Sequence, residues 1–224
     1  MSQSSLNLIA IGVFSLTFLS LIAPIINLSP TFPASITALL LGLGVLDTFA
    51  WNNQGSNILL DILADEEQKK RIIYHEAGHF LVAYYLGIPV KDYTLNSWDA
   101  WRRGYSGRGG IVFDLEMLKI EQAKLDNFCT VWLGGIAAEK FIYKKAEGGV
   151  TDKQNVLIAL NLAGIPTSQH QQKINLALIR AQELIKQHQE SYYLLVDALS
   201  KSLSVTECYQ ILEQFDSQKL GFRF

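Results

Sequence analysis

The stretch RIIYHEAGHFLVAYYLG, residues 71–87, decides how the rest of the chain is interpreted. It places His75 and His79 four residues apart, with Glu76 directly after the first histidine. Residues four apart lie on one face of an α-helix, so the two imidazoles can direct nitrogens at a single point. Glu76 lies about 100° around the helix axis, beside that point. Such a position suits a carboxylate that takes a proton from a metal-bound water.

The flanking residues predict a helix with HEAGH near its middle. Asp65 can cap the amino-terminal end of the helix, and the Gln68 side chain can bond to the backbone N–H of Asp65 in return. Gly87 marks the carboxyl-terminal end of the helix. Gly78, inside the motif, costs about 1 kcal/mol of helix propensity relative to Ala, which makes sense where another backbone packs closely. The alternative is a chance polar patch on an amphipathic helix. Two unsupported imidazoles among apolar neighbours would, however, be costly.

Length and charge narrow the range of functions. The chain has 224 residues, enough for one ordinary domain plus appendages without disulfides. Its 19 basic and 21 acidic residues give a net charge of -2 and form no basic tract, so we expect no nucleic-acid partner. Cys129 and Cys208 lie far apart, which predicts buried, reduced thiols rather than a disulfide framework or a cysteine zinc site.

Two long apolar runs near the amino terminus predict a membrane anchor. Residues 6–27 carry no charge, and a second apolar run covers residues 34–51. Each is about long enough to cross a bilayer core as a helix, and the prolines between them suit a tight hairpin. A cleaved signal peptide is the alternative, but no basic segment precedes the first run. We therefore expect an anchor with its linker in residues 1–57.

Asp47 is the ionisable residue within these runs. Because it falls in the last turn, beside Trp51, we expect the lipid headgroup region to hydrate it. Basic residues follow the second run at Lys69, Lys70 and Arg71. This asymmetry favours an integral membrane protein whose carboxyl-terminal domain lies on the cytoplasmic or stromal side.

Two histidines do not complete a zinc site, so a third ligand must come from elsewhere. Val82 and Tyr85 stand where a metzincin has Gly and His, which excludes that pattern. Downstream carboxylates remain as candidates. Residues 125–143 combine small and apolar side chains as in a helix packed against another, and AEGGVTDKQNVLIALNLAG follows at residues 146–164.

The ordered motifs of this region resemble the peptidase domain of the FtsH family of membrane-anchored zinc metalloproteases. The resemblance rests on YHEAGH (residues 74–79), LGGIAAEK (133–140) and GGVTD (148–152), and it continues into the helical pattern of residues 180–212. It covers roughly residues 66–215. Ordered motifs at suitable separations rarely coincide by chance.

The resemblance implies a role for each of these motifs. It implies that His75, His79 and Asp152 hold one Zn²⁺ and that Glu76 activates the water in the fourth position. Asp152 is also interpretable as an ordinary first-turn acidic residue favoured by the helix dipole, and Glu139 is then the substitute ligand.

The chain also departs from the FtsH pattern. A short linker stands where FtsH enzymes carry an ATPase module, and no phosphate-binding motif occurs, so the arrangement is similar to stand-alone FtsH-like peptidases of photosynthetic lineages. PVKDYTLNSW and GGIVFD predict short strands. The loop between them carries Trp98, Trp101, Arg102 and Arg103. Three interpretations of these side chains stay open: they line a groove, they touch lipid headgroups, or they belong to an ordinary solvated loop. His170 and His188 have no partner at ligand spacing and are expected at the surface.

We therefore expect a mainly α protein: a two-helix transmembrane anchor, then an α-helical FtsH-like zincin domain with a small β element in residues 58–224. The expected function is zinc-dependent endopeptidase activity on unfolded or flexible polypeptides without its own ATPase. The alternative is a non-hydrolytic, metal-binding membrane scaffold or assembly factor for FtsH-type complexes. Expected partners are polypeptide substrates and membrane lipid, together with a second copy of the chain or an FtsH-type ATPase.

Overall fold

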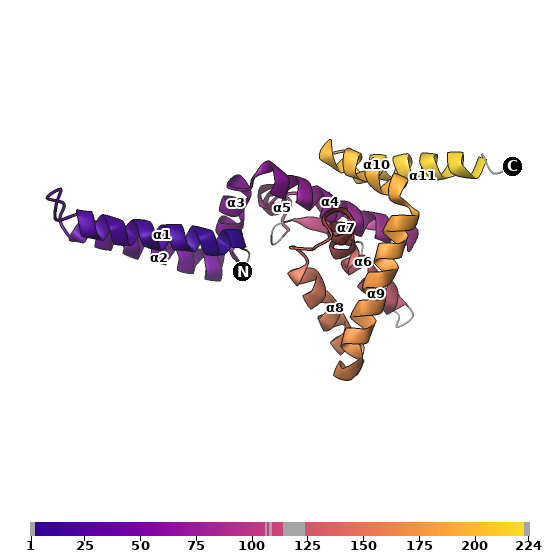
Figure 1. Ribbon diagram of the computed structural model, residues 1–224, viewed down its shortest axis with the longest axis horizontal. Helices are drawn as coiled ribbons and strands as arrows, with labels where there is room; N and C mark the ends of the chain where they lie inside the picture. Colours follow the sequence, from indigo (N-terminus) through magenta and orange to yellow (C-terminus); the bar gives the residue numbers. More distant parts are fainter. Residues whose placement is uncertain (1–2, 106, 108, 114–123, 222–224) are drawn as a thin grey trace. The chain divides into compact units, whose positions relative to one another are not determined.

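The computed structural model describes residues 3–105, 107, 109–113 and 124–221 and is mainly helical with a small sheet, as expected (Figure 1). In order along the chain, the helices and strands are α1 (Gln3–Ile22), α2 (Thr31–Ala50), α3 (Gln54–Ile62), α4 (Glu66–Tyr85), β1 (Val90–Thr94), α5 (Ser97–Arg102), β2 (Gly110–Phe113), α6 (Leu125–Trp132), α7 (Gly134–Tyr143), α8 (Val150–Leu162), α9 (Thr167–Gln187), α10 (Gln189–Ser200) and α11 (Val205–Gly221).

The chain divides into two compact units. The first unit combines Met1–Ala64 with Asn96–Gly109, and the second unit combines Asp65–Leu95 with Gly110–Phe224. The segment between β1 and β2 therefore belongs to the first unit, whereas both strands belong to the second. The functional boundary expected between residues 57 and 58 stays a prediction.

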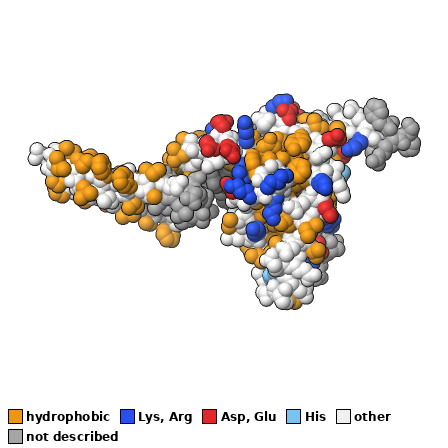
Figure 2. Space-filling model, viewed as in Figure 1, with side chains coloured by type: hydrophobic (Ala, Val, Ile, Leu, Met, Phe, Trp, Pro, Cys, Tyr) orange, Lys and Arg blue, Asp and Glu red, His pale blue; other side chains and the backbone are white. Residues whose placement is uncertain are grey.

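Helices α1 and α2 lie side by side as a hairpin whose surface is rich in hydrophobic side chains (Figures 1 and 2). Among the described residues, α2 alone is long and apolar enough to span a membrane, with a mean hydropathy of 1.6. Within the described part of α1, the apolar stretch is Ala10–Ile22, which is shorter than a membrane-spanning helix. Of the two spans expected, only the second is therefore matched. The first helix stops at Ile22 because Pro24 disfavours helical geometry in the residue before it.

Asp47 is buried rather than hydrated at a membrane surface, so that expectation is wrong. Its carboxylate accepts hydrogen bonds from the backbone N–H groups of Gly55 at 2.7 Å and Ser56 at 2.9 Å, and from the Ser56 hydroxyl. These donors belong to the first turn of α3, whose N–H groups have no partner within the helix. Residues 52–57, which we expected to form the linker after the second apolar run, thus include the start of a helix that is fixed to the end of α2.

The core of the second unit forms around α4, which packs against α7 and α10. Its fully buried large side chains include Phe80, Leu81, Phe128, Tyr192, Leu195, Leu199 and Leu212. Gly78 makes close packing with α7 possible, because a Cβ at this position would lie 2.5 Å from the Ala138 Cβ and from the Gly134 carbonyl oxygen. The close backbone approach predicted from Gly78 is confirmed.

Residues 125–143 form two helices rather than one. α6 ends at Trp132, and α7 begins at Gly134 after the connecting residue Leu133. The glycine pair at this junction weakens helix continuity. Both helices pack on α9, and in addition α6 packs on α8 while α7 makes the larger contact with α4.

Both expected strands are present, but the first ends at Thr94, so that Ser97 and Trp98 of its predicted stretch lie in α5 instead; Asp114, at the end of the second predicted stretch, lies outside the described residues. β1 and β2 pair antiparallel, with Val90 opposite Phe113 and Thr94 opposite Gly110, and the register shifts between Val90 and Asp92. β2 also lies against α4. The segment between the strands, expected to be a loop, contains the short helix α5, which Asn96 caps by accepting a hydrogen bond from the Asp99 N–H.

Neither histidine expected at the surface is fully exposed. His170 is buried, and its Nε2 lies 2.8 Å from the carbonyl oxygen of Ile165. His188 is half-buried and stacks on Tyr85, with ring centroids 3.6 Å apart. Both residues have structural contacts that their polar sequence surroundings did not indicate.

Candidate metal centre

The HEAGH motif lies within α4, as predicted, and both histidines are held by their Nδ1 atoms. The Nδ1 of His75 lies 2.7 Å from Oε1 of Glu139, and the Nδ1 of His79 lies 2.7 Å from the carbonyl oxygen of Val131. A carbonyl oxygen only accepts hydrogen bonds, so Nδ1 of His79 carries a proton and Nε2 is the nitrogen left to bind a metal. This is the arrangement by which proteins orient metal-binding histidines.

Asp152 meets both histidines on their Nε2 side. Its Oδ2 lies 3.1 Å from Nε2 of His75 and 3.5 Å from Nε2 of His79. The candidate ligand atoms of the three residues all lie within 4.8 Å of one another. Asp152 occupies the first turn of α8, which begins after Gly149 in a left-handed conformation with φ of 88°. The structure thus brings together the three residues expected to bind zinc.

Glu139, the substitute ligand considered from the sequence, lies on the opposite side of the His75 ring. Its buried carboxylate accepts hydrogen bonds from Arg71 at 3.0 Å and from the N–H groups of Glu147 at 2.8 Å and Gly148 at 3.1 Å. Burial raises the pKa of Glu139, but the hydrogen bonds from His75 and Glu147 outweigh it and lower the pKa to about 2. Glu139 is therefore an ionised support for His75, and the geometry favours Asp152 as the ligand.

Two glycines leave room for the His75 ring and its support. A Cβ on Gly135 would lie 2.2 Å from Nε2 of His75, and a Cβ on Gly148 would lie 2.6 Å from Oε1 of Glu139. Distances this short require the neighbouring atoms to move. The glycines of LGGIAAEK and GGVTD are therefore required by the packing around the site.

Glu76 lies beside the three candidate ligands. Its buried side chain accepts a hydrogen bond from the Ile111 N–H of β2 at 3.0 Å. Burial raises the pKa of Glu76, while the two histidines act in the opposite direction. A carboxylate that is a stronger base than usual, and that is held in place by one backbone donor, is suited to accept a proton.

The charges around the site favour a cation. Burial lowers the pKa of His75, yet its hydrogen bonds with Asp152 and Glu139 outweigh burial and raise that pKa to about 10. Burial raises the pKa of Asp152, but His79 and His75 hold it well below its ordinary value. Two imidazole nitrogens and one carboxylate oxygen are a donor set that Zn²⁺ accepts, so the residues present fit the metal.

Sequence reasoning missed several parts of this arrangement. They are the Val131 carbonyl that holds His79, the Ile111 N–H that holds Glu76, and the guanidinium of Arg71 that supports Glu139. Only Arg71 carried a usable signal, because it precedes His75 by four residues and so lies on the same face of α4. Backbone groups on other elements leave no trace in a side-chain pattern.

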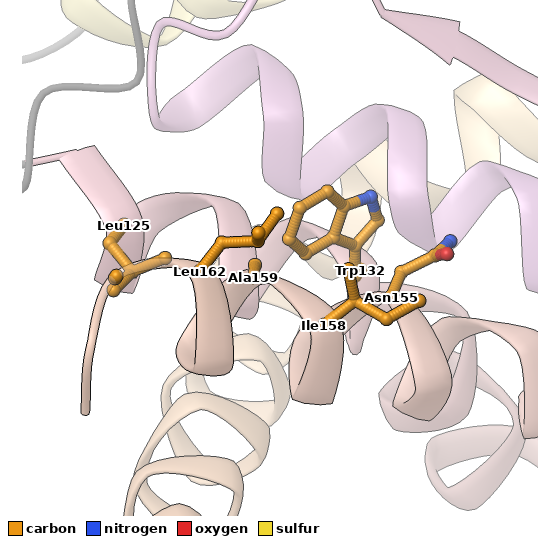
Figure 3. A pocket seen from close by; sticks show the side chains of 7 residues that line it. Leu125, Trp132, Asn155, Ile158, Ala159 and Leu162 are labelled. Carbon is orange, nitrogen blue, oxygen red and sulfur yellow. The ribbon is translucent and has the colours of Figure 1, made fainter. Parts of the chain in front are cut away.

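A pocket of about 420 Å³ lies between α6 and α8. The Trp132 indole and the Asn155 amide lie toward one end of the pocket, and Leu125 lies toward the other (Figure 3). Trp132 directly follows Val131, and Asn155 lies one helical turn after Asp152. The pocket is therefore built on the same two helices that contribute Asp152 and the acceptor for His79.

The chain is similar to part of two ATP-dependent zinc metalloproteases named FtsH. It is 36% identical over 112 residues to the protein of Synechococcus sp. (strain JA-2-3B'a(2-13)), a match that covers 46% of this chain and 16% of that protein. It is 30% identical over 98 residues to the protein of Karelsulcia muelleri (strain DMIN), covering 43% of this chain and 15% of that protein. No family model matches the chain. The chain therefore contains an FtsH-related region and spans about a sixth of the length of these relatives.

Proposed function

We propose that the chain is a membrane-anchored zinc metalloendopeptidase that hydrolyses peptide bonds in unfolded or flexible polypeptides without an ATPase of its own. One observation carries this proposal: the Nε2 atoms of His75 and His79 meet the Asp152 carboxylate, while their Nδ1 atoms are held by separate acceptors. Partial similarity to zinc metalloproteases supports it.

His75, His79 and Asp152 would hold the zinc ion. When bound at such a site, zinc polarises the scissile carbonyl and lowers the pKa of a coordinated water to about 7. Glu139 keeps the His75 ring oriented by accepting the hydrogen bond of Nδ1, and the Val131 carbonyl does the same for His79. The protein's contribution here is to fix the ligands before the substrate arrives.

Glu76 would move the proton. The burial-raised pKa allows its carboxylate to accept a proton from the attacking water as the water oxygen bonds to the peptide carbon. The same carboxyl group then gives this proton to the departing amine nitrogen as the carbon–nitrogen bond breaks. The Ile111 N–H holds the carboxylate in place during both transfers.

The site also has features suited to an extended polypeptide. β2 pairs with β1, yet the Ile111 N–H is directed to Glu76 instead of to β1. An extended chain added along this side of β2 would run past the proton acceptor, with backbone hydrogen bonds that are indifferent to sequence. The pocket between α6 and α8 would receive an apolar side chain of the substrate.

The proposal is tested by cleavage of casein, a loosely folded substrate, with the purified full-length chain and its Glu76→Gln variant. We expect the zinc-loaded chain to cut casein and the variant to lose at least ~100-fold in rate, since general base catalysis contributes about that much. The variant should keep its zinc, because Glu76 is not among the proposed ligands. Zinc binding with no cleavage by either protein would favour the non-hydrolytic scaffold instead.

A further inference from the structure

Helix α5 is fixed to the end of α2 through α3. Asp47, in the last turn of α2, caps α3. The buried Gln54 side chain of α3 then donates to the Ser97 carbonyl of α5 at 2.7 Å, and the Ser97 N–H donates to Asp61 of α3 at 2.6 Å. All these residues belong to the first unit. The position of α5 is therefore set by the carboxyl-terminal end of the candidate membrane span.

This end of the first unit exposes three tryptophans. Trp51 is 59% exposed, Trp98 50% and Trp101 54%, and the rings of Trp98 and Trp101 contact each other at a centroid distance of 5.2 Å. They border a pocket of about 620 Å³, whose lining residues also include Ala50, Gln54, Ile58 and Tyr105. Such a concentration of exposed indoles marks a binding surface rather than an ordinary solvated one.

The length of α2 places this surface at the edge of a bilayer. Its 20 residues rise about 1.5 Å each, so the helix is about 30 Å long, which matches the hydrocarbon core. If α2 crosses the membrane, its end at Ala50 lies at the boundary with the headgroups. Indole rings favour this layer because they combine an apolar ring with a polar N–H.

Two arginines follow the aromatic residues of α5. Arg102 and Arg103 are exposed in the structure. Guanidinium groups bind phosphate well, and basic residues near a membrane surface are attracted to anionic lipids. Aromatic rings beside arginines are thus the composition expected for contact with phospholipid headgroups.

We propose that Trp51 and α5 form an interfacial platform that inserts into the headgroup layer of the membrane crossed by α2, with phospholipid occupying the pocket among the three tryptophans. The inference rests on the membrane anchor of the proposed function and is independent of the zinc chemistry. The platform would fix the tilt and depth of the segment that connects β1 to β2.

The test uses the full-length chain in vesicles of phosphatidylcholine and phosphatidylglycerol, with the acyl chains brominated near the headgroup. Bromine quenches the fluorescence of nearby indoles. The chain has four tryptophans, of which three belong to the platform and Trp132 lines the pocket between α6 and α8. We expect brominated lipid to remove more than half of the emission of the unaltered chain and of the Trp132→Phe control.

Two further variants separate the platform from the anchor. In the double variant Trp98→Phe/Trp101→Phe, the quenched part of the emission should shrink by at least half, whereas Trp51→Phe should reduce it less. Quenching that persists in the double variant and disappears in Trp51→Phe would overturn the platform and leave the anchor intact. Absence of quenching in the unaltered chain, with no flotation on vesicles, would overturn both.

Iodide quenching of the unaltered chain distinguishes lipid from protein as the occupant of the surface formed by the three tryptophans. Iodide in the aqueous phase should quench little of the emission when the tryptophans lie in the headgroup layer. Protection from iodide without quenching by brominated lipid would mean that a protein segment covers the surface, and the platform proposal would then be wrong.

Discussion

The Nδ1 of His75 lies 2.7 Å from a carboxylate oxygen of Glu139, which has a side chain only 1% exposed to solvent. Arg71 and two backbone N–H groups hold the same carboxylate. Glu139 therefore sets both the orientation of His75 and the charge behind it, without occupying a position among the proposed ligands.

Replacing Glu139 with Gln should weaken zinc binding while the ligand set stays intact. Changes in groups that orient metal ligands cost about 10- to 100-fold in affinity, and we expect a loss of this size. Competition with a chelator of known zinc affinity measures the loss. Glu147→Gln is the matched control, since its side chain is 54% exposed, and it should change the affinity by less than about threefold. Equal affinities for all three proteins would show that Glu139 does not support the site.

Gly78→Ala should destabilise the protein although alanine favours helices more than glycine does. Propensity alone predicts a gain of about 1 kcal/mol. The new Cβ would, however, lie 2.5 Å from atoms of Gly134 and Ala138, and overpacking of this kind costs about 1–3 kcal/mol. The measurement is the free energy of unfolding from a urea titration.

Gly44→Ala is the control for that experiment, because a Cβ at Gly44 meets nothing within 4 Å. It should leave the free energy of unfolding unchanged or slightly higher. An increase in stability for Gly78→Ala would mean that α4 and α7 do not pack as closely as the structure shows.

The two cysteines should react slowly with thiol reagents while the protein is folded. Both are buried, and burial raises the pKa of each thiol to about 11. Because the thiolate is the reactive form, we expect rates on the order of 100-fold below those of a free cysteine at pH 8. Ellman's reagent measures the reaction, and both thiols should react quickly after unfolding in urea. Fast reaction in the folded state would contradict their burial.

The proposed peptidase should depend on the stability of its substrate and not on ATP. Opening a folded domain typically costs about 5–15 kcal/mol, which peptide hydrolysis at a zinc site does not supply. We therefore expect the purified chain to cut a destabilised mutant of a small domain and to leave the stable form intact, with or without ATP. Equal cleavage of both forms, or acceleration by ATP, would contradict the proposal.

The sequence predicted the parts of the site that are local in the chain. His75, Glu76 and His79 are separated by few residues, so helical geometry alone fixes their relative positions. The glycine turn before α8 and its first-turn carboxylate Asp152 were identified through the resemblance to FtsH enzymes. The support by Glu139 was not foreseen, because it depends on how α7 packs against α4 at a separation of 64 residues.

The errors in predicting the fold have a related cause. Asp47 was expected to face the headgroups, but it caps α3, an interaction that requires the chain to turn back after α2. His170 has polar neighbours in sequence yet is buried, and its Nε2 lies 2.8 Å from the Ile165 carbonyl oxygen in the connection between α8 and α9. Local patterns describe a helix and its faces, whereas the choice of which polar groups are enclosed is made by packing between elements.

Anomalous diffraction at the zinc edge, from crystals of the zinc-loaded protein, tests most directly whether His75, His79 and Asp152 form one metal site. We expect a single strong peak with Nε2 of both histidines and one Asp152 oxygen at roughly 2.0–2.2 Å. Glu139 should remain on the Nδ1 side of His75, outside this distance. A peak coordinated by Glu139 in place of Asp152, or no zinc peak between the two histidines, would show that these three residues do not form the metal site.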